Sequence, residues 1–150
     1  MLRIVMTVLS VLSLVSPAIA MDGMIELPSA HTPHASLDRL EALAKERGMK
    51  VFVRIDHAAG ARGIGQELRP TELIMFGNPK GGTPLMLCSQ TYGIDLPLRV
   101  LAWEDDKGAS WLGYIDLAAL GHPHPGAECD AAIKRLTATL DELVRGAAKP

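Results

Sequence analysis

The chain has 150 residues and a mass of 16.1 kDa, and 48% of its residues are hydrophobic. This apolar content excludes a globally disordered chain and suits the core of one small domain. Fifteen basic and 17 acidic residues give a net charge of -2, and no run of Lys or Arg is present. We therefore expect no nucleic-acid partner, because such surfaces work by neutralising phosphates with clustered positive charge.

The first 20 residues are typical of an export signal. Arg3 gives a positive start, Ile4–Val15 is almost wholly apolar, and Ala18 and Ala20 are small residues suited to cleavage. We predict cleavage after Ala20, which removes Arg3 and leaves 14 basic against 17 acidic residues, a net charge of -3. The alternative is an uncleaved anchor, although the apolar stretch is shorter than the roughly 20 residues that span a bilayer.

The first half of the remaining chain, residues 21–150, alternates between strand and helix patterns. A strand is expected at 24–27, stopped by Pro28. Thr32 and Pro33 form a helix start, an apolar stripe follows, and Gly48 ends the helix. Apolar residues alternate with polar ones over 50–56, which predicts a half-buried strand. One or two helical turns are expected within 58–68.

The second half predicts a strand, a helix, a hairpin and a last helix. The short apolar run 73–76 is expected to be a strand covered on both faces, followed by a loop at 77–82. Thr83 and Pro84 repeat the cap-plus-proline start of a helix, which should end near Gly93. Two β-prone runs, 98–103 and 110–115, flank a turn, and a linker at 121–128 precedes a helix at about 129–146.

The expected order is therefore β-α-β-(α)-β-α-β-β-α. This order predicts an α+β fold, a small single-domain sandwich of helices on a largely antiparallel sheet. Several segments resemble the domain of unknown function 302 family: Val51–Ala61, Leu68–Leu73, Phe76–Lys80, Gly82–Met86, Gly93–Leu98 and Trp103–Glu104. The resemblance covers about residues 24–120. It implies a small α+β domain that is often exported in bacteria, and it implies no established reaction.

Cys88 and Cys129 are the two cysteines of the chain. In an oxidising compartment a disulfide between them would close a loop of about 40 residues and contribute roughly 4 kcal/mol. The alternative is two separate thiols, since Cys88 lies at helical spacing with Leu85 and Tyr92 and suits a core position. The residues leave both alternatives open, and neither cysteine belongs to the family pattern.

The strongest candidate site is a polar edge where two strands end. Asp56 and His57 follow one strand, and Asn78 and Lys80 follow another. If the two strands are neighbours, we expect these groups to converge on a ligand, with Thr83 beside them and Trp103 as an aromatic wall. The alternative is turn chemistry, in which the same side chains only fix loops by local hydrogen bonds.

Other candidates carry weaker signals. The glycine-rich segment 60–65 could hold a phosphate, but its spacing matches no known phosphate loop and a flexible connector is favoured. His122 and His124 are weak metal-ligand candidates; Cys129, His31 and His34 could join them, but no closed four-ligand spacing is present. Cys88 with His57 could form a thiol nucleophile, although an apolar stripe is a poor setting for one.

The pattern as a whole favours an exported binding domain over an enzyme. We expect it to bind a small molecule or a protein partner in the periplasm or outside the cell, with no cofactor and no stable membrane insertion after cleavage. The alternative is a metal- or thiol-dependent redox accessory protein that uses Cys88, Cys129, His122 and His124. A third hypothesis is a module that self-associates through an exposed sheet edge.

Overall fold

The computed structural model describes residues 23–121 and 126–150. The predicted cleavage after Ala20 and the two linker histidines, His122 and His124, lie outside these residues, so both remain predictions. Within the two described ranges, the longest helix has 22 residues and no helix has the length and apolar content needed to cross a membrane.

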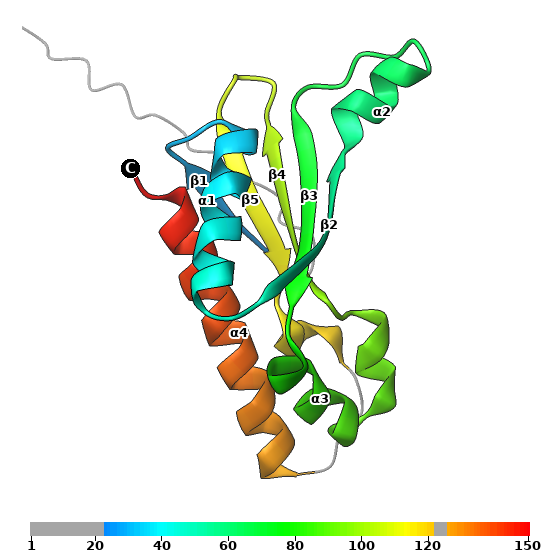
Figure 1. The fold of residues 1–150 in the computed structure, drawn as a ribbon, viewed down its shortest axis with the longest axis vertical. Helices are drawn as coiled ribbons and strands as arrows, with labels where there is room; N and C mark the ends of the chain where they lie inside the picture. Colours follow the sequence, from blue (N-terminus) through cyan, green and yellow to red (C-terminus); the bar gives the residue numbers. More distant parts are fainter. Residues whose placement is uncertain (1–22, 122–125) are drawn as a thin grey trace, which may run out of the picture.

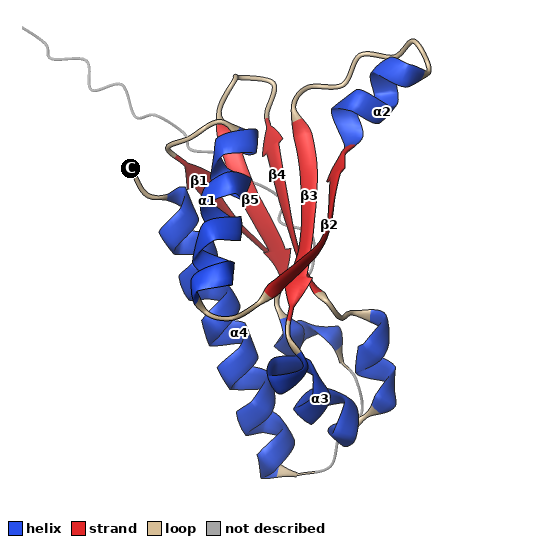
Figure 2. Cartoon of the chain, in the orientation of Figure 1, coloured by secondary structure: helices blue, strands red, loops and turns tan. Residues whose placement is uncertain are grey.

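Five antiparallel strands form one sheet in the spatial order β1-β5-β4-β3-β2 (Figures 1 and 2). The strands are β1 (Met24–Ser29), β2 (Lys50–Asp56), β3 (Thr71–Gly77), β4 (Leu98–Glu104) and β5 (Ser110–Ile115). The predicted hairpin is β4–β5, and every neighbouring pair in the sheet is antiparallel. The α+β class and the largely antiparallel sheet are therefore confirmed.

Two long helices, α1 (Pro33–Glu46) and α4 (Ala127–Ala148), lie side by side on the same face of this sheet (Figure 1). Helix α3 (Pro79–Cys88) lies where β3 ends, and α2 (His57–Gly63) lies beyond the opposite end of the sheet. Two short 3-10 helices complete the chain, η1 (Gln90–Ile94) and η2 (Leu117–Leu120). The observed order of strands and α-helices matches the predicted one, with η1 and η2 as additions. The helix expected to end near Gly93 ends at Cys88, and η1 follows it.

The core lies between the sheet and the two long helices. Leu37 and Leu40 of α1 and Val144 of α4 are fully or almost fully buried against strand residues such as Ile74 and Phe76. At about 25 cal/mol per Å² of apolar surface, this burial is the main stabilising contribution to the fold. The helices α1 and α4 therefore hold one face of the sheet fixed.

Helix α1 begins and ends at the predicted signals. The hydroxyl Oγ1 of Thr32 accepts a hydrogen bond from the backbone N–H of Ala35 at 3.3 Å, and Pro33 occupies the first helical position. Gly48 follows the helix with a positive φ of 69°, a conformation that favours glycine. Local sequence signals are sufficient here, because each acts within one helical turn.

The expectation that β3 is covered on both faces is wrong. Glu72, Ile74 and Phe76 are buried beneath the helices, whereas Leu73 and Met75 on the other face remain partly exposed. Within the part of the chain that the structure describes, helices cover only one side of the sheet, so the apolar run 73–76 has one face without a helix. Pro28 likewise does not stop β1: it pairs with Trp111 in the edge strand, where its missing N–H is tolerated.

Helix α3 begins earlier than predicted, at Pro79 rather than after Thr83. The expected loop at 77–82 contains its first turn, because Asn78 caps the helix: its Oδ1 accepts a hydrogen bond from the N–H of Gly81 at 2.9 Å. Pro84 therefore lies inside the helix. The segment contains two possible helix starts, Asn78–Pro79 and Thr83–Pro84, and the helix begins at the first of them.

Cys88 and Cys129 form a disulfide, with their Cα atoms 5.7 Å apart. The bridge joins the last residue of α3 to the first turn of α4. The alternative of two separate thiols is therefore wrong, and Cys88 cannot act with His57 as a thiol nucleophile while the bridge is intact.

Candidate functional site

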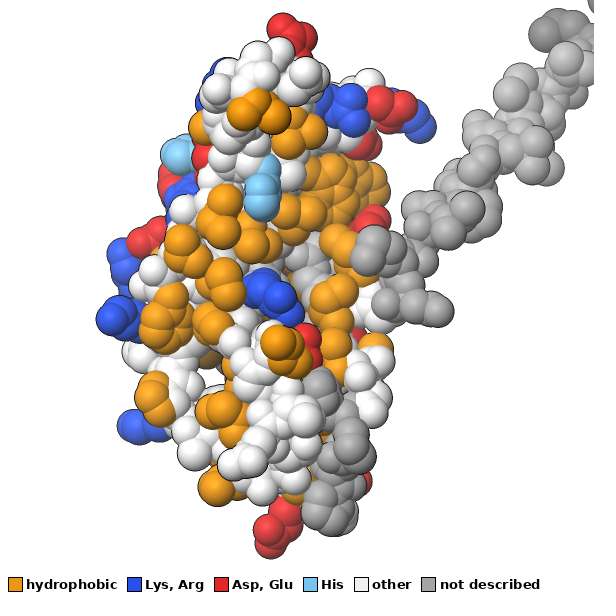
Figure 3. Space-filling model, turned by 90° about the vertical axis from the view of Figure 1, so that its right-hand side faces the viewer, with side chains coloured by type: hydrophobic (Ala, Val, Ile, Leu, Met, Phe, Trp, Pro, Cys, Tyr) orange, Lys and Arg blue, Asp and Glu red, His pale blue; other side chains and the backbone are white. Residues whose placement is uncertain are grey.

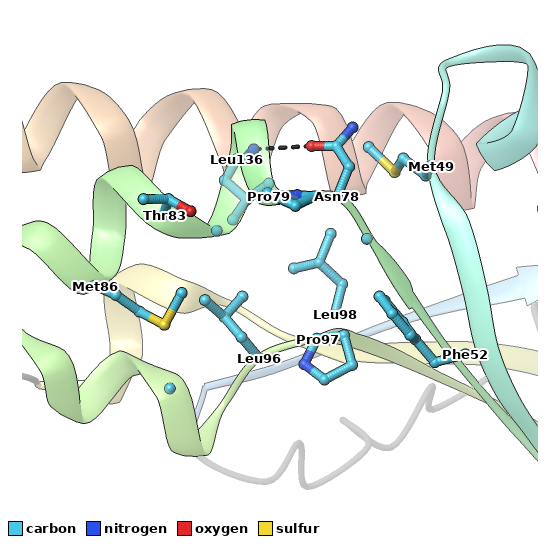
Figure 4. A pocket seen from close by; sticks show the side chains of 14 residues that line it. Met49, Phe52, Asn78, Pro79, Thr83, Met86, Leu96, Pro97, Leu98 and Leu136 are labelled. Carbon is cyan, nitrogen blue, oxygen red and sulfur yellow. Dashed lines mark hydrogen bonds between the residues drawn. The ribbon is translucent and has the colours of Figure 1, made fainter.

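A cavity of about 410 Å³ lies at the end of the sheet where β3 passes into α3. Its lining comes from four separate parts of the chain: the β2 region, the β3–α3 junction, the segment from η1 into β4, and α4. Figure 4 shows Leu98 and Leu96 between the two methionines, with Asn78 on the opposite side. Met86 lies at the left of this view, and Met49 lies at the upper right, above Phe52.

Aliphatic and aromatic side chains form most of the cavity wall. Met49 and Phe52 come from the β2 region, and Leu96, Pro97 and Leu98 lead into β4. Leu98 is buried at 3% exposure, whereas Phe52 is 54% exposed. The cavity is therefore anchored in the core at one side and bordered by an exposed aromatic ring at the other.

Phe52 owes its position to an irregularity in β2. Val51 pairs with Phe76 and Val53 pairs with Met75, so the register shifts by one residue and Phe52 is the extra residue of a β-bulge. A bulge redirects a side chain that regular alternation would place elsewhere. The ammonium of Lys50 lies 5.7 Å from the centre of the Phe52 ring, so the ring also carries a cation contact.

The first turn of α3 forms the polar side of the cavity. Asn78 supplies the cap described above, and Thr83 adds a hydroxyl one turn later. The two glycines in this turn lie close to their neighbours: a Cβ on Gly81 would lie 3.2 Å from Leu136, and one on Gly82 would lie 3.2 Å from Leu96, so a larger residue would require these leucine side chains to shift. The Gly81–Gly82 pair thus lets α3 approach both walls closely.

A second, smaller hollow of about 250 Å³ adjoins the cavity and shares Asn78 with it. Lys80 and Arg135 line this hollow, and neither forms an ion pair with any residue in the described ranges. Positive charge is therefore available beside a mainly apolar cavity. An anionic group that reaches past Asn78 would meet both cations.

The predicted polar edge is divided between the two ends of the sheet. Asp56 pairs with Glu72 at one end of the β2–β3 ladder, while Lys50 pairs with Gly77, next to Asn78, at the other. Six residue steps of a strand separate these ends by about 20 Å. The expected convergence of Asp56 and His57 with Asn78, Lys80 and Thr83 is therefore wrong, because the neighbouring strands run antiparallel.

The residues at the far end have local partners. Asp56 caps α2, with its Oδ1 accepting a hydrogen bond from the N–H of Ala59 at 2.7 Å, and its other oxygen lies 3.7 Å from Arg62. His57 is the exposed first residue of α2. Trp103 pairs with Thr71 on the face without helices. Asn78 and Thr83 line the cavity and Lys80 the adjoining hollow, but whether the six residues bind a ligand remains a prediction.

The weaker candidates have also been separated by the fold. Gly60 and Gly63 lie in helix α2, so the glycine-rich segment does not form a phosphate loop. His31 contacts the carbonyl of Lys149 at 2.7 Å, and Cys129 is in the disulfide. Among the residues with described positions, no three His, Cys, Asp or Glu side chains form a group that could hold a metal ion.

A charged network joins α1, β2 and β3 near the end of the sheet where β2 passes into α2. The Arg54 guanidinium donates a 3.0 Å hydrogen bond from Nε to buried Glu72 and a further bond to Asp38, and His34 Nδ1 lies 2.9 Å from Glu72. Burial alone would lower the pKa of Arg54, but its bonds to Asp38 and Glu72 raise it above its ordinary value. Every charge in this network is paired, which indicates a structural role.

The cavity residues missed by the sequence reasoning come from segments that looked like ordinary strand and turn. Phe52 carried one usable signal: it is apolar at a position where the alternation of β2 predicts a polar residue. Leu96 and Pro97 carried none, since an apolar residue before a proline is common at a strand start.

Comparison with known proteins places this geometry in a family. The family model described as "Domain of unknown function DUF302" matches residues 25–143. The chain belongs to the DUF302 family. The fold agrees with that of the "uncharacterized conserved protein DUF302 from Bacillus stearothermophilus", a crystal structure with a TM-score of 0.65 and 16% identity. That match covers 84% of this chain and 95% of the other, and at this identity it supports the fold alone.

Two Brucella proteins, each named "Fluoride-specific ion channel FluC 1", are similar to this DUF302 chain. The proteins from Brucella suis biovar 1 (strain 1330) and Brucella abortus biovar 1 (strain 9-941) are both 45% identical to it over 127 residues. These residues are 84% of this chain but 50% and 47% of the two relatives. The chain thus spans about half the length of the curated relatives it matches.

Proposed function

We propose that this DUF302 domain binds a small, mainly apolar molecule in the cavity between β2, α3 and α4. The single observation that carries the proposal is the cavity's size and lining. A volume of about 410 Å³ lies within the roughly 300–1,000 Å³ of small-molecule sites, and such sites are mostly apolar with a few polar groups. Here Asn78 and Thr83 are those polar groups.

The neighbouring hollow extends the proposal to the ligand's polar end. Lys80 and Arg135 lie past Asn78 without a carboxylate partner in the described ranges. An apolar body in the main cavity and an anionic group toward Lys80 would satisfy both surfaces. We therefore propose an amphiphilic ligand class, with the anionic end adding less affinity than the apolar body because both cations are exposed.

We further propose that the domain works after export, in the periplasm or outside the cell. The disulfide supports this location, because such bridges persist in oxidising compartments and are rare in the cytosol. The apolar leader with small residues before Ala20 supports it independently.

Fluoride enters as a candidate through the names of the Brucella relatives. The cavity chemistry does not favour it here: a small, strongly hydrated anion needs several N–H donors or cations to replace its water, whereas this wall is mainly hydrocarbon. Fluoride titration of the domain is therefore a useful negative control for the binding experiment below.

The exposed ring of Phe52 allows the cavity to be tested without disturbing the core. With N-phenyl-1-naphthylamine as a neutral apolar probe, we expect fluorescence titration to show binding. Phe52→Ala should weaken it about tenfold by removing part of the wall, and Phe52→Asp should weaken it further. The matched control is Ile64→Ala, because Ile64 is 78% exposed and lies near the opposite end of β2.

Two further measurements are needed to interpret the titration: the stability of each variant and the presence of a retained ligand in the wild type. All three variants should unfold within about 0.5 kcal/mol of the wild type, since exposed positions rarely matter more. Native mass spectrometry of protein from its own compartment should show a retained small molecule. Equal probe affinity in the wild type and Phe52→Asp would show that the cavity is not the binding site.

A further inference from the structure

Among residues 23–121 and 126–150, no helix packs on the face of the sheet opposite α1 and α4 (Figure 2). The strand register defines this open face: Thr71, Trp103 and Trp111 share one row, Leu73, Leu101 and Gly113 share the next, and Met75 and Arg99 share the third. At the β2 edge, Val53 and Ile55 continue the last two rows and are 40% and 38% exposed. The open face is thus largely hydrocarbon across four strands.

The two tryptophans make part of this face flat. Their rings are nearly parallel, with centroids 6.5 Å apart, and a Cβ placed on Gly113 would lie 2.9 Å from the Trp103 ring. Trp103 therefore lies across Gly113 rather than standing upright. The indole N–H of Trp111 already donates a 2.8 Å hydrogen bond to Asp105, so its ring presents no unmet polar group.

Charge on the open face is sparse. Glu26 lies at its β1 edge, and Arg99 lies on β4 with its guanidinium 3.2 Å from Asp95. Figure 3, viewed from the β2 edge of the sheet with the open face edge-on, shows charged side chains along the helix-covered flank and mainly hydrophobic ones across the middle, with basic and acidic side chains among them. An apolar surface with a polar border is typical of a protein interface.

We propose that the open face is the interface of a homodimer, in which two sheets pack face to face. The four apolar strands together with the β1 edge, about 4.8 Å apart, and three rows about 6.7 Å apart cover roughly 500 Å² per copy. Two copies thus bury about 1,000 Å², which is the lower limit for a specific interface. The partner is a second copy of this chain, because the surface is self-complementary.

The self-complementarity follows from the order of the rows. Leu101 lies in the middle row, so a two-fold axis perpendicular to the strands through Leu101 exchanges the first and third rows. Arg99 of one copy then faces the ring of Trp103 in the other, which is a favourable cation–π pair. The central leucines face their own counterparts. This arrangement uses the sheet face, whereas the sequence hypothesis used a sheet edge.

Tryptophan fluorescence is a direct probe of this interface, because the two tryptophans of the chain both lie on the open face. In sedimentation experiments on the purified protein, we expect the mass of two copies, and a shift of tryptophan emission to shorter wavelength as concentration rises. Leu101→Arg should weaken association at least a hundredfold and return emission to longer wavelength. Leu101→Met and Leu87→Arg are the controls, since Leu87 is 83% exposed on α3 and off this face.

Circular dichroism should show that each variant is folded, and Ile55→Arg provides a second interface variant at an exposed edge position. Three outcomes overturn the proposal: the mass of one copy with long-wavelength emission at all concentrations, a dimer that survives both arginine variants, or short-wavelength emission at the mass of one copy. The last outcome would assign the face to another segment of the same chain.

Discussion

Asn78 combines two roles that the sequence offered as alternatives. Its side chain caps α3, and the same residue lies between the apolar cavity and the cationic hollow. Its side chain makes a local hydrogen bond, as the turn-chemistry alternative expected, but it caps a helix rather than a loop turn, and its part in ligand binding remains a proposal. A substitution at this position has to be judged on stability and on binding separately.

Asn78→Ala should lower the free energy of unfolding by about 1 kcal/mol, because the N–H of Gly81 loses its acceptor at the start of α3. Urea unfolding measures this change. Asn78→Asp is the matched control: it keeps the capping oxygen and should stay close to the wild type. An Asn78→Ala protein as stable as the wild type would show that the cap makes no net contribution.

Asp141 gives the molecule an acid-sensitive contact. Arg145 donates hydrogen bonds from Nε to both carboxylate oxygens, and the buried Tyr114 hydroxyl donates a third at 2.7 Å. The bonds from Arg145 and then from Tyr114 lower the pKa of Asp141 below its ordinary value of 3.8. A lowered folded-state pKa means that this contribution is complete above about pH 3.8 and is lost as the pH falls further.

Asp141→Asn should therefore be less stable than the wild type near pH 6 and should lose less stability between pH 4 and pH 2. The measurement is the free energy of unfolding in urea at several pH values. Glu142→Gln serves as the control, because Glu142 is the neighbouring acid and pairs with Arg47 at the surface. Parallel pH profiles for wild type and Asp141→Asn would contradict the assignment.

At the scale of elements, prediction succeeded where the signals were local. The cap of α1 and the pattern of the β4–β5 hairpin act within a few residues, so their positions follow from the sequence. Helix α3 was misplaced because Asn78–Pro79 and Thr83–Pro84 are equally good starts. The start that is used places Gly81 and Gly82 against Leu136 and Leu96, which are distant in the sequence and therefore not visible to a local signal.

The antiparallel pairing of β2 with β3 explains why the residues of the predicted site do not converge. Both strands were expected and both exist, but their antiparallel register places the residues after each strand at opposite ends. Helical coverage of one sheet face is likewise a property of connections between elements. The apolar run 73–76 would have the same sequence pattern whether its second face is covered by a helix, by a partner or by water.

At the scale of the whole molecule, the cavity could not have been predicted, because its wall joins residues from 49 to 136. No spacing rule relates Phe52 to Leu136; only the finished topology brings them to one place. The disulfide has the same character. Its two residues were identified as the available pair, but their approach depends on α3 meeting α4.

The disulfide should act on the unfolded chain as well as on the local contact of α3 with α4. It joins residues 41 positions apart, so the double variant Cys88→Ser/Cys129→Ser should lose up to roughly 4 kcal/mol of unfolding free energy. Urea unfolding with and without a thiol reductant measures this. Reduction should bring the wild type to the level of the variant and leave the variant unchanged. The redox alternative would be favoured if reduction left the unfolding free energy of the wild type unchanged and both thiols reacted with a thiol reagent in the native state. A bridge that opens so easily contributes little to the stability of the fold.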